Sequence, residues 1–306
     1  MNKLLKNNNI ILLEAAIIEQ LRRSGHVELH QTLMNAPLIY NKVEKEALRN
    51  IYQNYINISL DAEIPFLMCT PTWRTNQSRV SNSDINPSVN TDAVHFLQEI
   101  RNSQQSGKNL IKIGGMIGCR KDCYKPDEGL SAVESEQFHS WQIAQLTEAS
   151  PDFLIAATLP NVDEAKGIAK AMEKTGIPYI ISFVISRNGH ILDGTDMIDA
   201  VDMIDSSANQ KPLGFMINCS YPTFLCADKQ PSKLFTRLIG YQANASSLDH
   251  CDLDGADQLE KENLSDWGNE MLKLNKSYGI KILGGCCGTG EEHLKYIVNR
   301  NTQLIG

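Results

Sequence analysis

Short, continuous apolar runs alternate along the chain with longer segments in which apolar residues recur at helical spacing. Runs of this length, apolar at nearly every position, are typical of strands buried on both faces, as in a parallel sheet. The pattern predicts eight such strands, at 9–14, 64–70, 110–118, 153–158, 178–186, 213–220, 237–244 and 280–287.

The segments between these runs predict helices. Residues 162–176 and 263–279 carry apolar residues three and four positions apart and end in glycine, a common helix terminator. Residues 138–154 fit a helix before the fourth run. Eight strands alternating with helices in 306 residues most simply form one α/β domain, a single (β/α)8 barrel (TIM barrel) spanning 1–306.

An open, doubly wound sheet is the main alternative fold. It is disfavoured because no GxGxxG motif follows the first run. Four segments look longer than ordinary strand-to-helix loops, and they are 71–109, 119–137, 220–236 and 245–262. Because barrel enzymes build their sites from loops on the C-terminal face, we expect the functional site there.

Composition narrows the class of protein further. A hydrophobic fraction of 42% allows a large core, and a net charge of −7 argues against nucleic-acid binding. No apolar run approaches the roughly 20 residues that span a bilayer. The N-terminal apolar stretch is broken by Glu14 and lacks a small-residue cleavage site, so we do not interpret it as a signal peptide. Eight cysteines in such a chain predict reduced thiols and a cytoplasmic protein.

Three cysteines fall at the predicted ends of strands six and eight: Cys219, Cys286 and Cys287. In a closed barrel these two ends are separated by one strand and face a common mouth. Three thiolates suit zinc, and three protein ligands leave a fourth position open, as in catalytic zinc sites. Gly284, Gly285 and Gly288 would let neighbouring cysteines turn toward one ion.

Other interpretations of the cysteines remain open. Cys69, Cys226 and Cys251 fit the pattern of small buried hydrophobic residues. Cys119 and Cys123 form a C-x3-C pair with no second pair or nearby histidine, which is weak support for metal binding. A disulfide between the adjacent Cys286 and Cys287 is a further alternative. We expect His95, His139 and His293 to be surface residues rather than catalysts.

"INCSYP" (217–222) followed by "GIKILGGCCGTGEEHL" (279–294) resembles the homocysteine S-methyltransferase family. The family has Asn-Cys after strand six and Gly-Gly-Cys-Cys-Gly-Thr after strand eight. Segments 159–165 and 182–201 are also similar to the family's fourth and fifth strand regions. The resemblance covers most of the chain and implies a TIM barrel with Zn²⁺ held by Cys219, Cys286 and Cys287.

That resemblance implies a methyltransferase of methionine biosynthesis. A small thiol, homocysteine by default, would lose its proton on binding zinc and attack a methyl group on a cationic or cofactor donor. The polar residues at the other strand ends are the candidates for substrate binding: Glu14, Thr158, Ser182 and Asn244. The expected partners are a small-molecule thiol and a methyl donor, with no nucleic acid and no membrane. A homo-oligomer is compatible with the sequence.

The chain departs from the family pattern where the amino-acid part of homocysteine binds. Ala15 and Ala16 follow Glu14 where the family has glycines, and Ala157 stands where the family has a glutamate that pairs with the substrate ammonium. The loop "GCRKDCYKP" (118–126) lacks the family's Gly-Pro-Tyr-Gly. Glu14 or Glu19 could supply the lost charge, or the chain could take another thiol.

Two other classes of function stay open at this point. One is a non-catalytic barrel that binds zinc and a different thiol or ligand, and Ala157 favours it. The other is a thiol-redox protein that uses Cys286 and Cys287 as a reversible disulfide. A zinc-dependent methyltransferase explains all three strand-end cysteines together.

Overall fold

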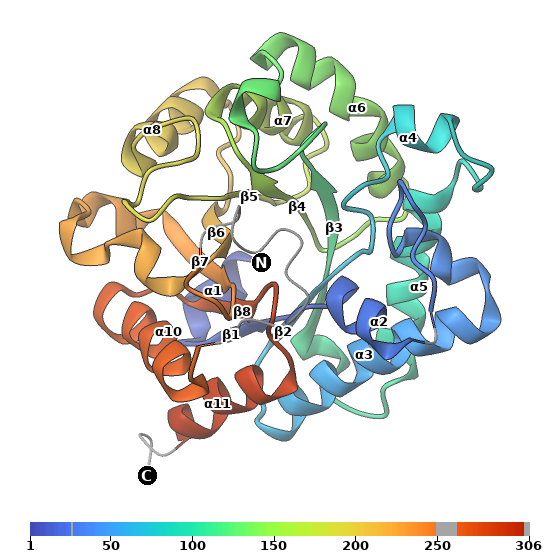
Figure 1. Cartoon of the computed structure of the whole chain (residues 1–306), viewed down its shortest axis with the longest axis horizontal. Coiled ribbons are helices and arrows are strands. Elements are labelled where there is room, and N and C mark those ends of the chain that lie inside the picture. Colours follow the sequence, from blue (N-terminus) through green and yellow to red (C-terminus); the bar gives the residue numbers. More distant parts are fainter. Residues whose placement is uncertain (26, 249–261, 303–306) are drawn as a thin grey trace.

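Eight parallel strands form a closed barrel in the computed structural model, which describes residues 1–25, 27–248 and 262–302 (Figure 1). Each strand pairs with the next along the chain, and β8 pairs with β1 through Ile11 opposite Ile282 and Leu12 opposite Leu283. The strands are β1 (Ile11–Leu13), β2 (Phe66–Cys69), β3 (Ile111–Gly118), β4 (Phe153–Leu159), β5 (Tyr179–Phe183), β6 (Gly214–Ser220), β7 (Leu238–Ala243) and β8 (Ile282–Gly285). The predicted (β/α)8 barrel is confirmed, and the open sheet is excluded.

Helices surround this barrel, and one connection lacks an α-helix. Three short 3₁₀ helices join β6 to β7 instead: η4 (Pro222–Leu225), η5 (Ala227–Lys229) and η6 (Ser232–Thr236). The helices on the outside are α3 (Lys42–Asp61), α5 (Val89–Ser103), α6 (Ala132–Glu148), α7 (Val162–Glu173), α8 (Met197–Ser207), α10 (Leu264–Tyr278) and α11 (Glu291–Thr302). Shorter elements are α1 (Asn2–Asn7), α2 (Ile18–Ser24), α4 (Gln77–Ser81), η1 (Ala36–Tyr40), η2 (Lys108–Leu110) and η3 (Pro126–Glu128).

Two expectations about helices need correction. The helix before β4 begins at Ala132 rather than at residue 138, because Ser131 and Glu134 form a capping box there, and it ends at Glu148. Segment 71–109 is not one long loop, since it contains α4 and α5. The buried residues of α5 recur at helical spacing: Val89, Ala93, Phe96 and Ile100.

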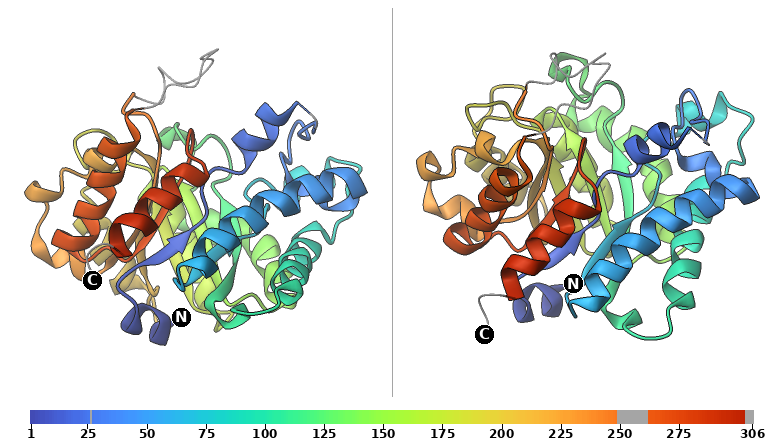
Figure 2. Two further views of the ribbon diagram at one scale, coloured as in Figure 1. Left: turned by 90° about the horizontal axis from the view of Figure 1, so that it is seen from below. Right: turned by 60° about the horizontal axis from the view of Figure 1, so that its bottom comes forward.

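The barrel interior is packed rather than open. Ile11, Leu67, Phe153, Ile180 and other strand residues form one buried cluster inside the ring. Side chains of α1 pack against that cluster at the end where the strands begin, and Figure 2 shows α1 at that end. This end is therefore closed, which leaves the opposite, C-terminal face for a site. Among the described residues, no helix is long and apolar enough to cross a membrane.

We predict that Gly167→Ala destabilises the protein, although alanine is the better helix former. A Cβ on Gly167 in α7 would lie 2.3 Å from the Ala132 carbonyl oxygen and 2.5 Å from the Ser135 Cβ of α6. Helix propensity alone would make the folded variant about 1 kcal/mol more stable than the wild type. The overpacking by the new Cβ would destabilise it by about 1–3 kcal/mol. Urea unfolding should show a net loss. The control Lys166→Ala in the same helix should change stability little, and a more stable Gly167→Ala would contradict the packing.

Candidate metal centre

A cavity of about 1240 Å³ opens at the C-terminal face of the barrel. Its walls come from the ends of the strands and from the loops that follow β1, β2, β3 and β8. Figure 1 looks onto the C-terminal ends of the strands. Cys219 at the end of β6 and Cys286 and Cys287 after β8 are among the residues that line the cavity. The C-terminal ends of the strands therefore bring together residues that are far apart in the sequence.

The sulfur atoms of Cys219, Cys286 and Cys287 all lie within 4.8 Å of one another. The Sγ atoms of Cys219 and Cys286 are 2.7 Å apart. Cys219 is buried, Cys286 is partly buried and Cys287 is exposed. Among the described residues this is the one group of at least three Cys, His, Asp or Glu side chains close enough to share an ion.

Asn218 positions Cys219 through four hydrogen bonds. Its Oδ1 accepts from the Thr158 backbone N–H at 2.8 Å and from the Ser182 hydroxyl at 2.7 Å. Its Nδ2 donates to Thr158 Oγ1 at 2.9 Å and to Cys219 Sγ at 3.3 Å. The buried amide thus ties the ends of β4, β5 and β6 together and contacts the sulfur directly.

Two of the three residues bonded by this amide have an uncommon backbone conformation. Thr158 has φ 60° and Cys219 has φ 54°, in the left-handed region that β-branched residues in particular avoid. The strand register shifts at each of them, between Ala156 and Leu159 and between Asn218 and Ser220. Such strain costs about 1–3 kcal/mol per residue and persists where surrounding contacts enforce it, often at functional sites. Here it aims the Cys219 side chain into the cavity.

The turn after β8 is held on both sides by backbone hydrogen bonds. The Cys286 N–H donates to the Ala243 carbonyl at 2.7 Å, and the Cys287 carbonyl accepts from the Ala245 N–H at 2.9 Å. Gly288 has φ 80°, a conformation that glycine adopts without strain. A Cβ on Gly284 would lie 2.9 Å from the Glu14 carbonyl oxygen. Gly288 thus supplies the left-handed turn and Gly284 the close approach to the loop after β1, and Gly285 likewise lies close to Thr289.

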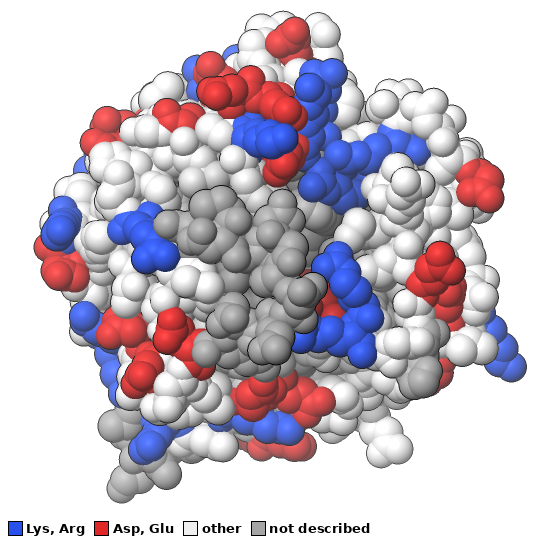
Figure 3. Space-filling model, viewed as in Figure 1, with Lys and Arg blue, Asp and Glu red and all other residues white. Residues whose placement is uncertain are grey.

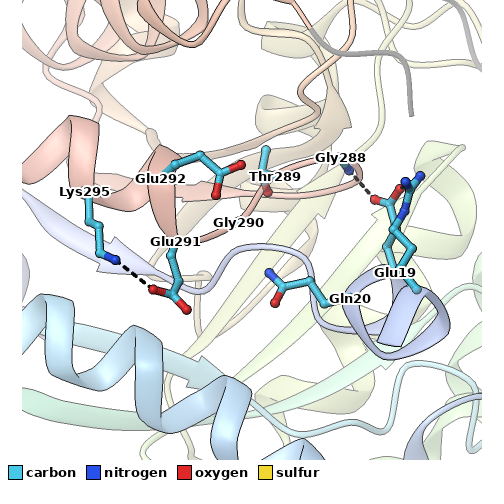
Figure 4. Close-up of a pocket in the computed structure, with 9 residues that line it drawn as sticks. Glu19, Gln20, Gly288, Thr289, Gly290, Glu291, Glu292 and Lys295 are labelled. Carbon is cyan, nitrogen blue, oxygen red and sulfur yellow. Dashed lines mark hydrogen bonds and ion pairs between the residues drawn. The ribbon is translucent and has the colours of Figure 1, made fainter. Parts of the chain in front are cut away.

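A smaller cavity of about 410 Å³ lies behind this turn. Figure 4 shows Glu19 directed at Gly288, whose N–H donates to the Glu19 carboxylate. Thr289 Oγ1 donates to the Cys286 carbonyl at 2.6 Å and accepts from the Ala16 N–H at 3.3 Å. The turn that carries two of the cysteines is therefore fixed to the loop after β1.

The crowded thiols are suited to a bound cation. Hydrogen bonds with Cys219 and Cys287, together with burial, raise the pKa of the Cys286 thiol well above its usual range. Three neighbouring thiolates are therefore unfavourable in the protein alone, and a divalent cation would offset their mutual repulsion. With Zn–S bonds of about 2.3 Å, tetrahedral geometry separates sulfurs by about 3.8 Å. The three sulfurs lie within 4.8 Å of one another, a range that includes this separation, and the Cys219–Cys286 pair at 2.7 Å is closer than it.

The other described cysteines do not form a second cluster. Cys69 is buried in the barrel interior, as expected. Cys226 is only half-buried, contrary to expectation, because it occupies a left-handed turn between η4 and η5 where its thiol contacts the Arg187 carbonyl at 3.4 Å. Cys119 and Cys123 are buried free thiols, and Cys123 lines the cavity. Cys251 lies outside the described residues.

The polar residues expected to bind substrate occupy two different positions. Glu14, Thr158 and Asn244 line the cavity, whereas Ser182 is not among its lining residues and donates to Asn218 instead. Asn244 is 2% exposed, its Nδ2 donates to the Cys219 carbonyl at 3.0 Å, and its Oδ1 has no hydrogen-bond partner in the described structure. The cavity therefore holds one unsatisfied acceptor beside the cysteines.

The residues that depart from the family pattern also line this cavity. Ala15, Ala16 and Ala157 all face it, and neither Ala15 nor Ala16 has a positive φ, so their Cβ atoms cause no backbone strain. Burial raises the pKa of Glu14 to about 8, partly offset by the Cys69 N–H that donates to its Oε2 at 2.7 Å. Glu14 is thus mostly neutral at pH 7.

Two histidines expected on the surface are buried. His95 is exposed, but His139 is fully buried with its Nε2 2.9 Å from Glu164 Oε1, and His293 is 2% exposed. Glu164 Oε1 also accepts from the Arg120 N–H at 2.7 Å. The buried pair therefore anchors the start of the loop after β3, which is a structural role that helical spacing alone did not reveal.

Sequence reasoning missed several residues of the cavity. The sequence marked Asn218 only as part of an Asn-Cys motif. Its position next to Cys219 at the end of a predicted strand was the one feature that could have indicated its supporting role. Trp73, Arg74 and Arg79 lie in the segment after β2 and form one wall of the cavity. No motif marks them, because only the folding of this segment over the barrel mouth places them there.

Comparisons with known proteins agree with this geometry. The family model for homocysteine S-methyltransferase matches residues 11–300, and the chain belongs to this family. Relatives include homocysteine S-methyltransferase 1 of Brassica oleracea var. italica, 29% identical over 56% of this chain and 52% of that protein. The chain thus spans about half the length of this relative, but it covers 93% of homocysteine S-methyltransferase YbgG of Bacillus subtilis, at 24% identity over 94% of this chain.

Solved structures show the same fold. The homocysteine methyltransferase MmuM from Escherichia coli in its metallated form superposes with a TM-score of 0.76 at 17% identity, covering 97% of this chain and 98% of that one. Its oxidized form gives a TM-score of 0.77 at 18% identity, covering 97% of each chain.

We predict that Asn218→Ala strongly destabilises the protein even without metal. The change leaves the buried Thr158 N–H and Ser182 hydroxyl without their acceptor, at about 1–3 kcal/mol for each buried unsatisfied group. Urea unfolding in the presence of a chelator should show a loss of about 3 kcal/mol or more. Ser182→Ala, the control, removes a donor and leaves no orphaned group there, so its loss should be clearly smaller. Equal losses would contradict the bridging role of Asn218.

We predict that Glu14 makes stability fall as pH rises from about 4.5 to 8. In that range folded Glu14 retains a proton that the unfolded chain has released, because burial raises its pKa to about 8. The loss is at most about 1.4 kcal/mol per pH unit. Glutamine does not titrate, so the Glu14→Gln variant should lack this loss. Urea unfolding with chelator should therefore show that the stability of Glu14→Gln minus that of the wild type is greater at pH 8 than at pH 5. Glu19→Gln is the control, and parallel pH curves for wild type and Glu14→Gln would refute the prediction.

Proposed function

We propose that the chain is a zinc-dependent methyltransferase that methylates a small thiol, homocysteine giving methionine being the default reaction. The observation that carries the proposal is the cluster of three sulfur atoms within 4.8 Å at the mouth of the barrel. Family membership supports it, because the chain retains both cysteine motifs through which the resemblance was found.

Cys219, Cys286 and Cys287 would hold the ion. When bound, zinc would supply a cation that favours the thiolate form of a substrate thiol at neutral pH. Asn218 keeps the Cys219 sulfur in place, and Thr289 and Gly288 hold the turn that carries the other two. No general base needs to lie nearby, and the buried His139 is engaged with Glu164.

Substrate contacts in the cavity would come from Glu14, Thr158 and Asn244, with Ser182 acting through Asn218. The unpartnered Asn244 Oδ1 is suited to accept a hydrogen bond from a substrate ammonium. Glu14 replaces the lost family carboxylate only when ionised, which its raised pKa opposes. Glu19 is already engaged with the Gly288 N–H and with Arg23 at 2.8 Å. The part of the cavity that would bind the substrate ammonium therefore carries less negative charge than the family pattern implies.

The partners of this reaction would be a small-molecule thiol and a methyl donor in the cytoplasm. Betaine-type, sulfonium and cofactor donors all remain compatible, because no donor motif marks the loops around the cavity.

A second candidate function is a non-catalytic barrel that binds zinc and another ligand. The observation favouring it is Ala157, which lines the cavity where the family has a carboxylate. This candidate predicts metal binding without turnover, whereas a redox function of Cys286 and Cys287 predicts a reversible disulfide and no zinc.

We predict that the purified protein contains about one zinc per chain and that Cys219→Ala loses it. Methionine formation from homocysteine and S-methylmethionine should fall about 100-fold or more in this variant and after treatment with a chelator. Metal analysis under reducing conditions and an assay of methionine check both statements. Cys226→Ala, away from the cluster, should retain zinc and activity. A wild-type protein without metal would overturn the proposal, and metal without turnover would support the second candidate.

A further inference from the structure

The cavity wall is basic although the chain as a whole is acidic. The net charge of the chain is −7, yet five cationic and three acidic side chains of the described residues line the cavity. Figure 3, which looks into the same face, shows Lys and Arg side chains on two sides of the mouth, over α2 and beside α4 and α6. The cationic residues are Arg22, Arg23, Arg74, Arg79 and Lys121, and the acidic ones are Glu14, Glu19 and Asp122.

Arg74 and Arg79 have no carboxylate partner among the described residues. Arg23 pairs with Glu19 at 2.8 Å, and Lys121 lies 3.9 Å from Glu128, but no ion pair within 4.0 Å involves Arg74 or Arg79 in the described structure. Both guanidinium groups instead donate to backbone carbonyls of the loop after β3. Arg79 Nη2 donates to the Arg120 carbonyl at 3.0 Å, and Arg74 Nη1 donates to the Lys121 carbonyl.

These contacts hold the guanidinium groups in place and leave donors unused. Arg74 stacks on the Trp73 ring at 4.0 Å. Arg79 Nη1 and Trp73 Nε1 are buried atoms without a hydrogen-bond partner in the described part of the chain. Trp73, Arg74 and Arg79 all line the cavity, and two unsatisfied donors together with two charges that have no carboxylate partner among the described residues favour a negatively charged acceptor there.

We propose that Trp73, Arg74 and Arg79 form a subsite for an anionic group, a carboxylate in the first instance, on the substrate that enters this cavity. Arginine suits this task because its planar donors match the two oxygens of a carboxylate and because it stays charged when partly buried. The inference rests on the proposed function, since it takes the occupant of the cavity to be a substrate of the methyl transfer.

The subsite has a consequence for substrate choice. Ala157 cannot hold an ammonium group, and burial keeps Glu14 mostly neutral, while the opposite charge is concentrated at Arg74 and Arg79. The cavity therefore recognises the anionic end of its ligand more strongly than a cationic end. The carboxylate could belong to the thiol or to the methyl donor, and these two sources can be separated by experiment.

Calorimetric titration of the zinc-loaded full chain tests the thiol first. The probes are 4-mercaptobutanoate, which carries a carboxylate and no ammonium, and 3-mercaptopropanol, a neutral thiol. We expect the carboxylate thiol to bind about tenfold or more tightly than the neutral thiol, as a charge-assisted hydrogen bond provides. Arg79→Gln and Arg74→Gln should each abolish most of this preference, and Arg79→Lys, which keeps charge but loses the planar fork, should retain part of it.

Arg22→Gln is the matched control. Arg22 is an exposed cavity residue without an ion pair in the described structure. Its replacement by glutamine removes one positive charge from the cavity, as Arg74→Gln and Arg79→Gln do, but leaves the proposed subsite intact. A preference lost equally in Arg22→Gln would indicate non-specific attraction and overturn the subsite. Thermal unfolding and zinc content of each variant show whether the loop after β3 is intact, and Arg79→Lys carries the test if Arg79→Gln is not folded.

The second arm compares dimethylsulfoniopropionate with trimethylsulfonium, a donor pair that differs in the carboxylate. If Arg79→Gln weakens binding of the former only, the carboxylate belongs to the donor and the subsite is supported. Absence of a carboxylate preference in both arms overturns the inference, even if methyl transfer occurs. A carboxylate preference that depends on Arg74 and Arg79, without turnover for any pair, supports the subsite and refutes the proposed function alone.

Discussion

The buried amide of Asn218 is the interaction on which the arrangement of the site depends. Its oxygen accepts from β4 and β5, and its nitrogen donates to Thr158 and to the Cys219 sulfur. Without that amide, the positive φ values of Thr158 and Cys219 would be strained without compensation. Because the register of β6 shifts at Cys219, the Cys219 side chain lines the mouth of the barrel.

The rest of the site is built around the two strands that carry cysteines. β7 lies between β6 and β8, and its last residue, Ala243, accepts the hydrogen bond from Cys286. Gly284 in β8 lets the chain approach Glu14, and Gly288 after β8 lets it turn. The barrel thus supplies a rigid frame for the sulfurs, which is what preorganisation of a metal site requires, while the loops after β2 and β3 supply the charged wall opposite.

The charge distribution explains why the two halves of the cavity differ. The cysteine half carries the features through which the family was identified, whereas the substrate half has alanines at the family's glycine and glutamate positions and arginines on the adjacent wall. A substrate held there experiences a positive field from Arg74 and Arg79 and little negative charge from Glu14. With the proposed subsite, substrate selection in this chain would depend on loops rather than on the strand ends that hold the sulfurs.

The barrel and the grouping of the three cysteines could be predicted from the amino-acid pattern. Continuous apolar runs mark doubly buried strands, and their number and alternation with helices leave few ways to close a core, so all eight strands could be placed. Cys219, Cys286 and Cys287 followed from strand ends that must share one face. Tertiary structure alone decided the role of Ser182, which supports Asn218, the burial of His139, and the approach of Arg74 and Arg79 to the cavity. These depend on long-range packing of loops and on positive-φ bulges, and no local periodicity encodes either.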